Sequence, residues 1–118
     1  MPIDAIPCPS VYIVDGDSLR CGSTRIRLLG IDAPELHGCP AWRQCVTGNG
    51  EASRQSLQRA LAYGRVTYRV VTVDRFGRSV VMAWAGRVNL SCYQLKAQQA
   101  VYKPQWDNGR QVGRACRV

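Results

Sequence analysis

Short runs of β-branched and aliphatic residues, bounded by turn residues, constrain the fold of this chain more than any other feature. Residues 10–14 and 18–21 flank the dipeptide Asp15-Gly16, which is typical of a tight β-hairpin turn. A third run, residues 24–31, ends shortly before Pro34, because proline disfavours a helical conformation in the residue that precedes it. The first third of the chain therefore predicts three consecutive strands.

The rest of the chain alternates between helical and extended patterns. Leucine and alanine recur at helical spacing within residues 51–62, and a shorter helix is expected from Asn89, a good N-cap residue, to about residue 99. Between them, residues 66–74 and 79–85 have the composition of two strands joined as a second hairpin. The predicted order is three strands, a helix, two strands and a helix.

This order predicts a mainly β protein with helices, an α+β fold. Five short strands suit a five-stranded barrel of the oligonucleotide/oligosaccharide-binding (OB) type with two or three short helices, because closure removes the exposed edges of a small sheet. An open α+β sheet is the alternative. The chain of 118 residues has the size of a single domain, 1–118, and its tail is expected to be irregular from about residue 103.

The chain is strongly basic. It carries 16 lysine and arginine residues against 8 acidic ones, a formal charge of +8 and a pI near 9.6. Basic proteins associate with nucleic acids because neutralised phosphates release counterions, although a generally basic surface has the same composition. No apolar run approaches the ~20 residues of a membrane helix, so we expect no membrane partner, and a monomer is the default expectation.

Six cysteines and a single histidine limit the possible chemistry. The even number of cysteines suits three disulfides formed in an oxidising compartment. Cys8 would face Cys21 across the first hairpin, and Cys39 and Cys45 lie in one loop; other pairings remain open. A zinc site that includes His37 is disfavoured because no Cys-x-x-Cys pair occurs, and we expect His37 to be an exposed loop residue.

Acidic residues are scarce, so their grouping within residues 26–35 requires an explanation. This segment, Ile-Arg-Leu-Leu-Gly-Ile-Asp-Ala-Pro-Glu, contains Arg27, Asp32 and Glu35. Carboxylates bind hard cations such as calcium or magnesium, and arginine offers paired donors to phosphate oxygens. Arg27 and Asp32 would point to opposite faces of an unbroken strand, so we expect a bulge at Gly30. The combination predicts a phosphodiester site.

Three blocks of sequence together resemble the staphylococcal-type thermonuclease (micrococcal nuclease-like) family. They are Val-Asp-Gly-Asp-Ser at residues 14–18, the segment 26–35, and Asp-Arg-Phe-Gly-Arg at residues 74–78, in the family's order and at compatible spacing. The resemblance covers roughly residues 10–102. The chain departs from the family pattern in having alanine at position 33, where threonine is frequent, and phenylalanine at position 76, where tyrosine is common.

The resemblance implies a role for each charged residue of these blocks. One calcium ion would be bound by the side chains of Asp17 and Asp32 and by the main-chain carbonyl of Ala33. Glu35 would act as the general base toward the attacking water, which agrees with the presence of only one histidine. The reacting phosphate would be contacted by Arg27 and Arg78.

Aromatic and basic residues are expected to flank the substrate. Aromatic rings can stack on bases or sugars, and cations can pair with the neighbouring phosphates. The residues that the resemblance suggests for this role are Arg75, Phe76, Tyr102 and Lys103. The tryptophans are instead expected to be core or loop anchors: Trp42, Trp84 and Trp106.

The function implied by the resemblance is that of a hydrolase. It would be a calcium-dependent endonuclease that cleaves DNA and RNA with little sequence preference and leaves 3′-phosphate ends. The alternative is an inactive OB-fold module that binds nucleic acid, which the complete set of charged site residues disfavours. We expect a secreted or periplasmic protein whose leader is absent from this chain, with a cytoplasmic location as the alternative.

Overall fold

The computed structural model describes residues 4–118, and five strands of four to eight residues form most of its sheet. Their residues are the β-branched and aliphatic runs recognised in the sequence. They are β2 (Val11–Asp15), β3 (Ser18–Cys21), β4 (Thr24–Leu28), β6 (Val66–Val73) and β7 (Ser79–Ala85). Four two-residue strands complete the extended structure: β1 (Ile6–Pro7), β5 (Ile31–Asp32), β8 (Val88–Asn89) and β9 (Val101–Tyr102).

Three α-helices accompany the strands, and asparagine side chains cap two of them. In α1 (Gly50–Ala60), the Asn49 carboxamide oxygen accepts a hydrogen bond from Ala52 N, at 3.0 Å. In α2 (Leu90–Lys96), Asn89 accepts from Cys92 N in the same way. The third helix is α3 (Gln111–Cys116), and short 3-10 turns are η1 (Leu61–Tyr63), η2 (Pro104–Trp106) and η3 (Asn108–Arg110).

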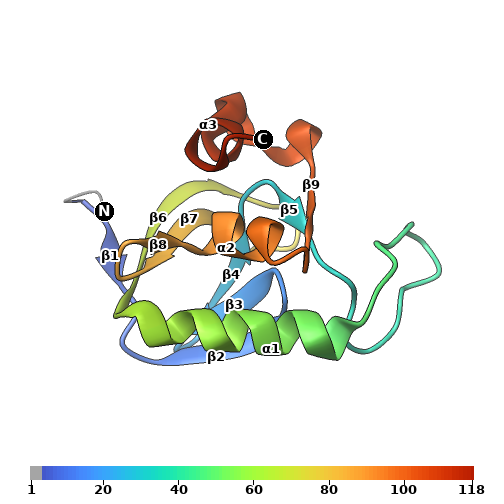
Figure 1. Ribbon diagram of the computed structural model, residues 1–118, viewed down its shortest axis with the longest axis horizontal. Coiled ribbons are helices and arrows are strands. Elements are labelled where there is room, and N and C mark those ends of the chain that lie inside the picture. The colour runs from blue at the N-terminus through green and yellow to red at the C-terminus, as the bar shows by residue number, and fades with distance from the viewer. Residues whose placement is uncertain (1–3) are drawn as a thin grey trace.

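The sheet curls into a half-barrel of the OB type, as the order of the strands predicted (Figure 1). The strand order is β1-β6-β7-β4-β3-β2, with β4 and β7 parallel and the other pairs antiparallel. β1 and β2 lie at opposite ends of this order, yet only residues 8–10 separate them in the chain. The two edge strands of the sheet therefore come from one short stretch of the chain.

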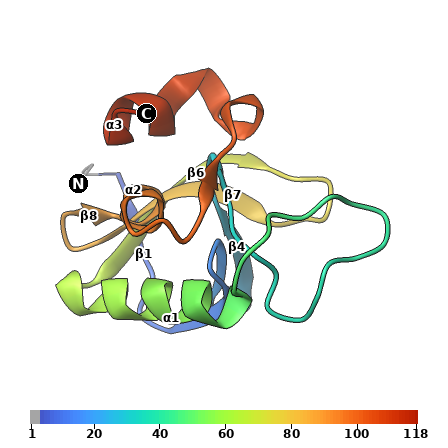
Figure 2. The same ribbon diagram turned by 45° about the vertical axis from the view of Figure 1, so that its right-hand side comes forward.

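The core lies between the curled sheet and the helices. In Figures 1 and 2, α1 runs along one side of the sheet, α3 lies on the opposite side, and α2 lies between them. Aliphatic side chains from the strands and from the first two helices are fully buried here: Leu19, Ile26, Leu28, Ile31, Leu57, Val81 and Leu90. Burial of such side chains is the main stabilising contribution to a fold of this size.

The C-terminal segment, which the sequence predicted to be irregular from about residue 103, contains two 3-10 turns and the helix α3. Val112 of α3 is fully buried against Leu29 and Met82. Two backbone N–H groups at the start of α3 donate to the carboxylate of Asp107. This helix depends on contacts with distant residues, which explains why its own sequence carries no clear helical pattern.

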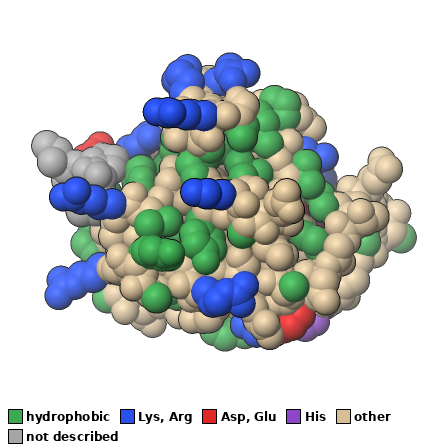
Figure 3. Space-filling model, in the orientation of Figure 1, with side chains coloured by type: hydrophobic (Ala, Val, Ile, Leu, Met, Phe, Trp, Pro, Cys, Tyr) green, Lys and Arg blue, Asp and Glu red, His purple; other side chains and the backbone are tan. Residues whose placement is uncertain are grey.

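Three disulfides staple the fold. Cys8–Cys21 and Cys39–Cys45 confirm the pairings that the spacing suggested, and Cys92–Cys116 joins α2 to α3. Three disulfides in so short a chain are typical of proteins from an oxidising compartment. Over residues 4–118, no helix has both the length and the apolarity needed to cross a membrane. Lysine and arginine side chains are spread over the face shown in Figure 3, where acidic side chains are sparse.

Candidate active site

A break in the third strand brings Arg27 and Asp32 to the same side of the barrel. β4 ends at Leu28, β5 begins at Ile31, and Gly30 between them has a φ of 76°, a conformation that glycine adopts without strain. The expected irregularity at Gly30 is therefore present. An Arg27 guanidinium nitrogen lies 3.6 Å from Asp32 Oδ1, and the same group donates to the carbonyl oxygen of Ile31 at 3.1 Å.

The turn of the first hairpin carries Asp17 into the interior. Asp17 is 4% exposed, and its Oδ2 accepts a hydrogen bond from Ala33 N at 2.8 Å. Gly16 leaves room for α1 in this turn, since a Cβ there would lie 1.8 Å from Ser53 Oγ. The Gln94 side chain donates to the carbonyl oxygen of Gly16 at 2.7 Å, so both α1 and α2 hold the turn in place.

Arg27 links the two aspartates. Its Nη1 lies 3.4 Å from Asp17 Oδ2 and its Nη2 lies 3.6 Å from Asp32 Oδ1. Asp32 is only 1% exposed, so both carboxylates share a largely dehydrated environment with one arginine. Two aspartates that are 15 positions apart in the sequence thus converge on one arginine.

Glu35 lies beside this pair and is held by Arg43, a residue that no motif in the sequence marked. Arg43 Nη1 donates to Glu35 Oε1 at 2.8 Å, and Arg43 Nη2 donates to both carboxylate oxygens of Asp32, at 3.0 and 3.2 Å. The backbone of Glu35 packs against the start of α1, where a Cβ on Gly50 would lie 2.3 Å from the Glu35 carbonyl oxygen. Asp15 also fixes this segment by accepting from Leu36 N at 3.1 Å.

The turn between β6 and β7 positions Arg78. The Asp74 carboxylate accepts hydrogen bonds from the backbone N–H groups of Phe76 and Arg78, and Oδ2 accepts from Arg78 Nε at 2.8 Å. Arg75 and Arg78 stack on the Phe76 ring, with guanidinium carbons 4.9 and 5.6 Å from its centroid. The turn therefore presents two arginines and an aromatic ring as one unit.

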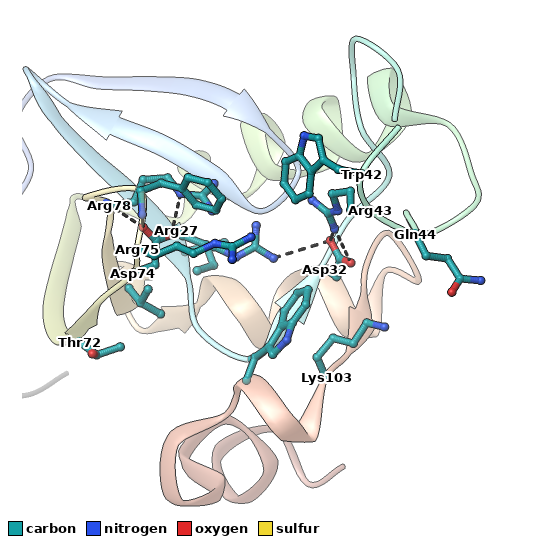
Figure 4. Close-up of a pocket in the computed structure, with 15 residues that line it drawn as sticks. Arg27, Asp32, Trp42, Arg43, Gln44, Thr72, Asp74, Arg75, Arg78 and Lys103 are labelled. Atoms are coloured by element: carbon teal, nitrogen blue, oxygen red, sulfur yellow. Dashed lines mark hydrogen bonds and ion pairs between the residues drawn. The ribbon is translucent and has the colours of Figure 1, made fainter. Parts of the chain in front are cut away.

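These elements line a pocket of about 440 Å³ at one mouth of the barrel (Figure 4). Its lining includes most of the residues predicted from the sequence: Arg27, Asp32, Arg75, Phe76, Arg78 and Lys103. Asp17 and Glu35 do not line the pocket themselves. Each forms an ion pair with an arginine that does: Asp17 with Arg27, and Glu35 with Arg43. In Figure 4 the labelled arginines of β4 (Arg27) and of the β6–β7 turn (Arg75 and Arg78) lie opposite Trp42 and Arg43, which come from the long loop before α1.

Tyr102 lies outside this pocket, although the sequence placed it among the substrate contacts. Its hydroxyl donates to Asp107 Oδ2 at 2.7 Å, so its ring is turned toward the C-terminal segment. Lys103, the next residue, does line the pocket, and its Nζ lies 5.6 Å from the ring centroid of Trp106. Neighbouring residues of an extended strand point in opposite directions, which accounts for the difference.

Two tryptophans, expected to be anchors, line the pocket instead. Trp42 and Trp106 are 65% and 41% exposed, and the Arg27 guanidinium lies 5.0 Å from the Trp106 ring centroid. Trp84 packs against the cluster around Met82, as an anchor would. The proximity of Trp42 and Arg43 to the predicted site residues in an irregular loop was the only signal in the sequence for their participation.

Burial and like charges act on the carboxylates of the site. Burial raises the pKa of Asp17. Arg27 and the hydrogen bond from Ala33 N lower this pKa, but they offset the effect of burial only in part. Burial and the carboxylates of Asp15 and Asp17 raise the pKa of Glu35, against the opposing effect of Arg43. Carboxylates whose ionised form is disfavoured in this way are typical of sites that bind a cation or accept a proton.

Oxygen donors are available for a hard metal ion. Asp17, Asp32 and the main chain at Ala33 lie together, because Ala33 N donates to Asp17 and Arg27 contacts both carboxylates. Within residues 4–118, no three side chains of the types Asp, Glu, His and Cys form a ready ligand cluster. His37 is exposed, as expected. Two carboxylates and a carbonyl oxygen would therefore have to be completed by water, which calcium tolerates.

Comparison with known proteins identifies the family. A search of curated proteins returns no match. Residues 25–114 match the sequence profile described as staphylococcal nuclease homologue, and this range includes the strand break, the long loop and the Asp74–Arg78 turn. The chain therefore belongs to the staphylococcal nuclease homologue family, whose members are generally nuclease-type hydrolases that act on nucleic acids.

Proposed function

We propose that this protein is a calcium-dependent endonuclease that hydrolyses phosphodiester bonds of DNA and RNA with low sequence specificity and leaves 3′-phosphate ends. The observation that carries the proposal is the position of Arg27, whose guanidinium lies within 3.4 and 3.6 Å of carboxylates from two distant segments while lining the same pocket as Arg78. The basic composition favours a polyanionic substrate.

The donor set fits a divalent ion. Asp17, Asp32 and the carbonyl oxygen of Ala33 would hold calcium, and the unfavourable burial of the Asp17 charge is a further reason to expect a cation here. When bound, the ion supplies Lewis-acid polarisation of a phosphate oxygen and lowers the pKa of bound water. Asp17 and Asp32 are proposed as ligands because both are buried and both lie beside the same pocket-lining arginine, Arg27.

Glu35 is proposed as the general base. It is partly exposed, with 24% of its side-chain area accessible, so water can reach it, and its pKa is raised from the ordinary glutamate value. A carboxylate with a raised pKa is a stronger base toward the attacking water than an ordinary glutamate. The water would lose its proton to Glu35 as it attacks phosphorus, and the 5′-oxygen would leave.

Arg27 and Arg78 are proposed to bind the reacting phosphate. Phosphoryl transfer depends mainly on positioning and on stabilisation of charge at the equatorial oxygens, and guanidinium forks supply both. Neighbouring nucleotides would contact Arg75, Phe76 and Lys103, which line the same pocket. We assign Tyr102 a positioning role, because its bond to Asp107 holds the segment that carries Lys103.

Digestion of single-stranded DNA and of RNA tests the proposal. The wild type should cut both with calcium and neither with a chelator, and end analysis should find 3′-phosphates. Glu35→Gln and Arg78→Ala should each lower the rate by on the order of 10²-fold or more, because each removes a contact to the reacting groups. Arg59→Ala, an exposed arginine on α1, is the charge-matched control and should retain the rate.

Two results would refute the assignment. Cleavage by Glu35→Gln and Arg78→Ala at the wild-type rate would show that Glu35 is not the general base and that Arg78 does not bind the reacting phosphate. Calcium-independent binding of nucleic acid without any cleavage would favour the inactive OB-fold module. For location, we propose the secreted or periplasmic space, which the three disulfides support.

A further inference from the structure

Arg43 already occupies the carboxylates that the proposed function assigns to calcium and to the general base. Its Nη2 bonds both oxygens of Asp32, at 3.0 and 3.2 Å, and its Nη1 bonds Glu35 at 2.8 Å. Asp32 is almost completely buried, so this ion pair is poorly screened by solvent. Arg43 is thus an internal cation whose charge-assisted hydrogen bonds use the same oxygen atoms that a divalent ion would need.

A small covalent ring delivers Arg43 to this position. The Cys39–Cys45 disulfide closes a loop of seven residues, and within it Arg43 N donates to the carbonyl oxygen of Pro40 at 3.3 Å. The ring lies in the long segment between β5 and α1, which contains no helix or strand (Figure 2). A restricted ring loses less conformational entropy than an open loop when it holds a side chain in one place.

The same ring contacts the substrate side of the pocket. The Trp42 ring lies 6.1 Å from the Phe76 ring, centroid to centroid, and Phe76 belongs to the turn that presents Arg78. Trp42 is 65% exposed, so few other contacts hold it. The disulfide-closed ring therefore contacts the barrel through the Arg43 ion pairs inside the site and through the Trp42–Phe76 pair at its mouth.

We propose that Arg43 is a latch on the metal site, which must withdraw before the divalent ion binds, so that the disulfide-closed loop sets the affinity for calcium. The inference rests on the proposed function, because it assumes that Asp32 holds the ion. A protein whose binding-competent state is only a fraction of the population binds with an affinity reduced by that fraction. Because coupling is reciprocal, calcium should in turn release the loop.

Calcium affinity of the full chain, measured by isothermal titration calorimetry without nucleic acid, tests the latch. Arg43→Gln should bind calcium about 10-fold more tightly than the wild type, as expected for a latch that is closed roughly nine-tenths of the time. Arg75→Gln is the matched control: it removes the same charge from the same pocket, where Arg75 stacks on Phe76, and should change the affinity by no more than about twofold. Cys39→Ser/Cys45→Ser opens the ring and should fall between Arg43→Gln and the wild type.

Hydrogen exchange of the loop gives an independent readout. Backbone amides of residues 38–46 should exchange faster in the wild type when calcium is added, and equally fast with and without calcium in Arg43→Gln. Equal or weaker calcium binding by Arg43→Gln, or calcium-insensitive exchange in the wild type, would overturn the latch while leaving calcium-dependent cleavage intact. If no variant binds calcium and digestion resists chelation, both the latch and the calcium dependence are wrong.

Discussion

Asp107 organises the C-terminal segment through a single carboxylate. It accepts hydrogen bonds from the Tyr102 hydroxyl at 2.7 Å, from Val112 N at 2.9 Å and from Gly113 N at 2.8 Å. Burial acts to raise the pKa of Asp107, but these three donors outweigh it, and the pKa lies below its usual value. The ionised form is therefore the one that the folded protein stabilises.

This arrangement makes part of the stability depend on pH. Because the folded pKa is lower than the unfolded one, the contribution is complete above pH ~4 and is lost as the pH falls through the folded pKa. Asp107→Asn should lower the unfolding free energy by about 1–3 kcal/mol at pH 7. The substitution replaces one of the two carboxylate oxygens that accept hydrogen bonds from the backbone N–H groups. Urea unfolding between pH 7 and pH 2 should show a shallower loss of stability in the variant; identical slopes would contradict this role.

The break between β4 and β5 is the local element on which the site depends. Gly30 combines a φ of 76° with close neighbours, because an added Cβ would lie 3.1 Å from Val112 and 3.3 Å from Asp107. Gly22, in the turn after β3, also has a positive φ, of 61°, but a Cβ added there would meet no atom within 4 Å. A side chain at either glycine would strain the backbone, but only a side chain at Gly30 would also crowd its neighbours.

Gly30→Ala should lose more stability than Gly22→Ala. Both variants incur roughly 1–2 kcal/mol of left-handed backbone strain, and Gly30→Ala should lose about 1–3 kcal/mol more from overpacking against α3. Chemical denaturation of the two variants measures the difference. Because Gly30 lies between Arg27 and Asp32, the proposed nuclease activity should fall only in Gly30→Ala; equal effects in both variants would refute the special role of Gly30.

Over residues 4–118 the molecule is a half-barrel cross-linked by three disulfides. Cys92–Cys116 closes the longest loop, with a sequence separation of 24, whereas Cys39–Cys45 has a separation of 6. In the chain-entropy view, a disulfide stabilises by restricting the unfolded chain, more strongly for a longer loop. The two bridges should therefore contribute unequally to the free energy of unfolding.

Serine variants of each pair test this ranking. Cys92→Ser/Cys116→Ser should lose about 3.5 kcal/mol of unfolding free energy, and Cys39→Ser/Cys45→Ser about 2.4 kcal/mol, by the loop-length relation. Urea unfolding with tryptophan fluorescence gives both values under the same conditions. A larger loss from the shorter loop would show that native contacts of the ring, rather than the unfolded chain, dominate its contribution.

Local patterns in the sequence were sufficient for the main elements. β-branched runs around Asp15-Gly16 and around the turn at residues 75–78 predicted both hairpins, and Asn89 predicted the start of α2. Two disulfides followed from short spacings within a hairpin and a loop. The three family blocks identified the charged residues that lie around the pocket. This was possible because the order and spacing of the blocks can be read from the sequence alone.

Contacts between distant residues lay beyond those patterns. α3 is stabilised by burial of Val112 against Leu29. Tyr102 points away from the pocket because its hydroxyl donates a hydrogen bond to Asp107. Arg43 reaches Asp32 and Glu35 only because a disulfide-closed loop folds back over the barrel mouth. Spacing and residue type specify which groups a chain carries, whereas burial and charge pairing across the fold set where each group points.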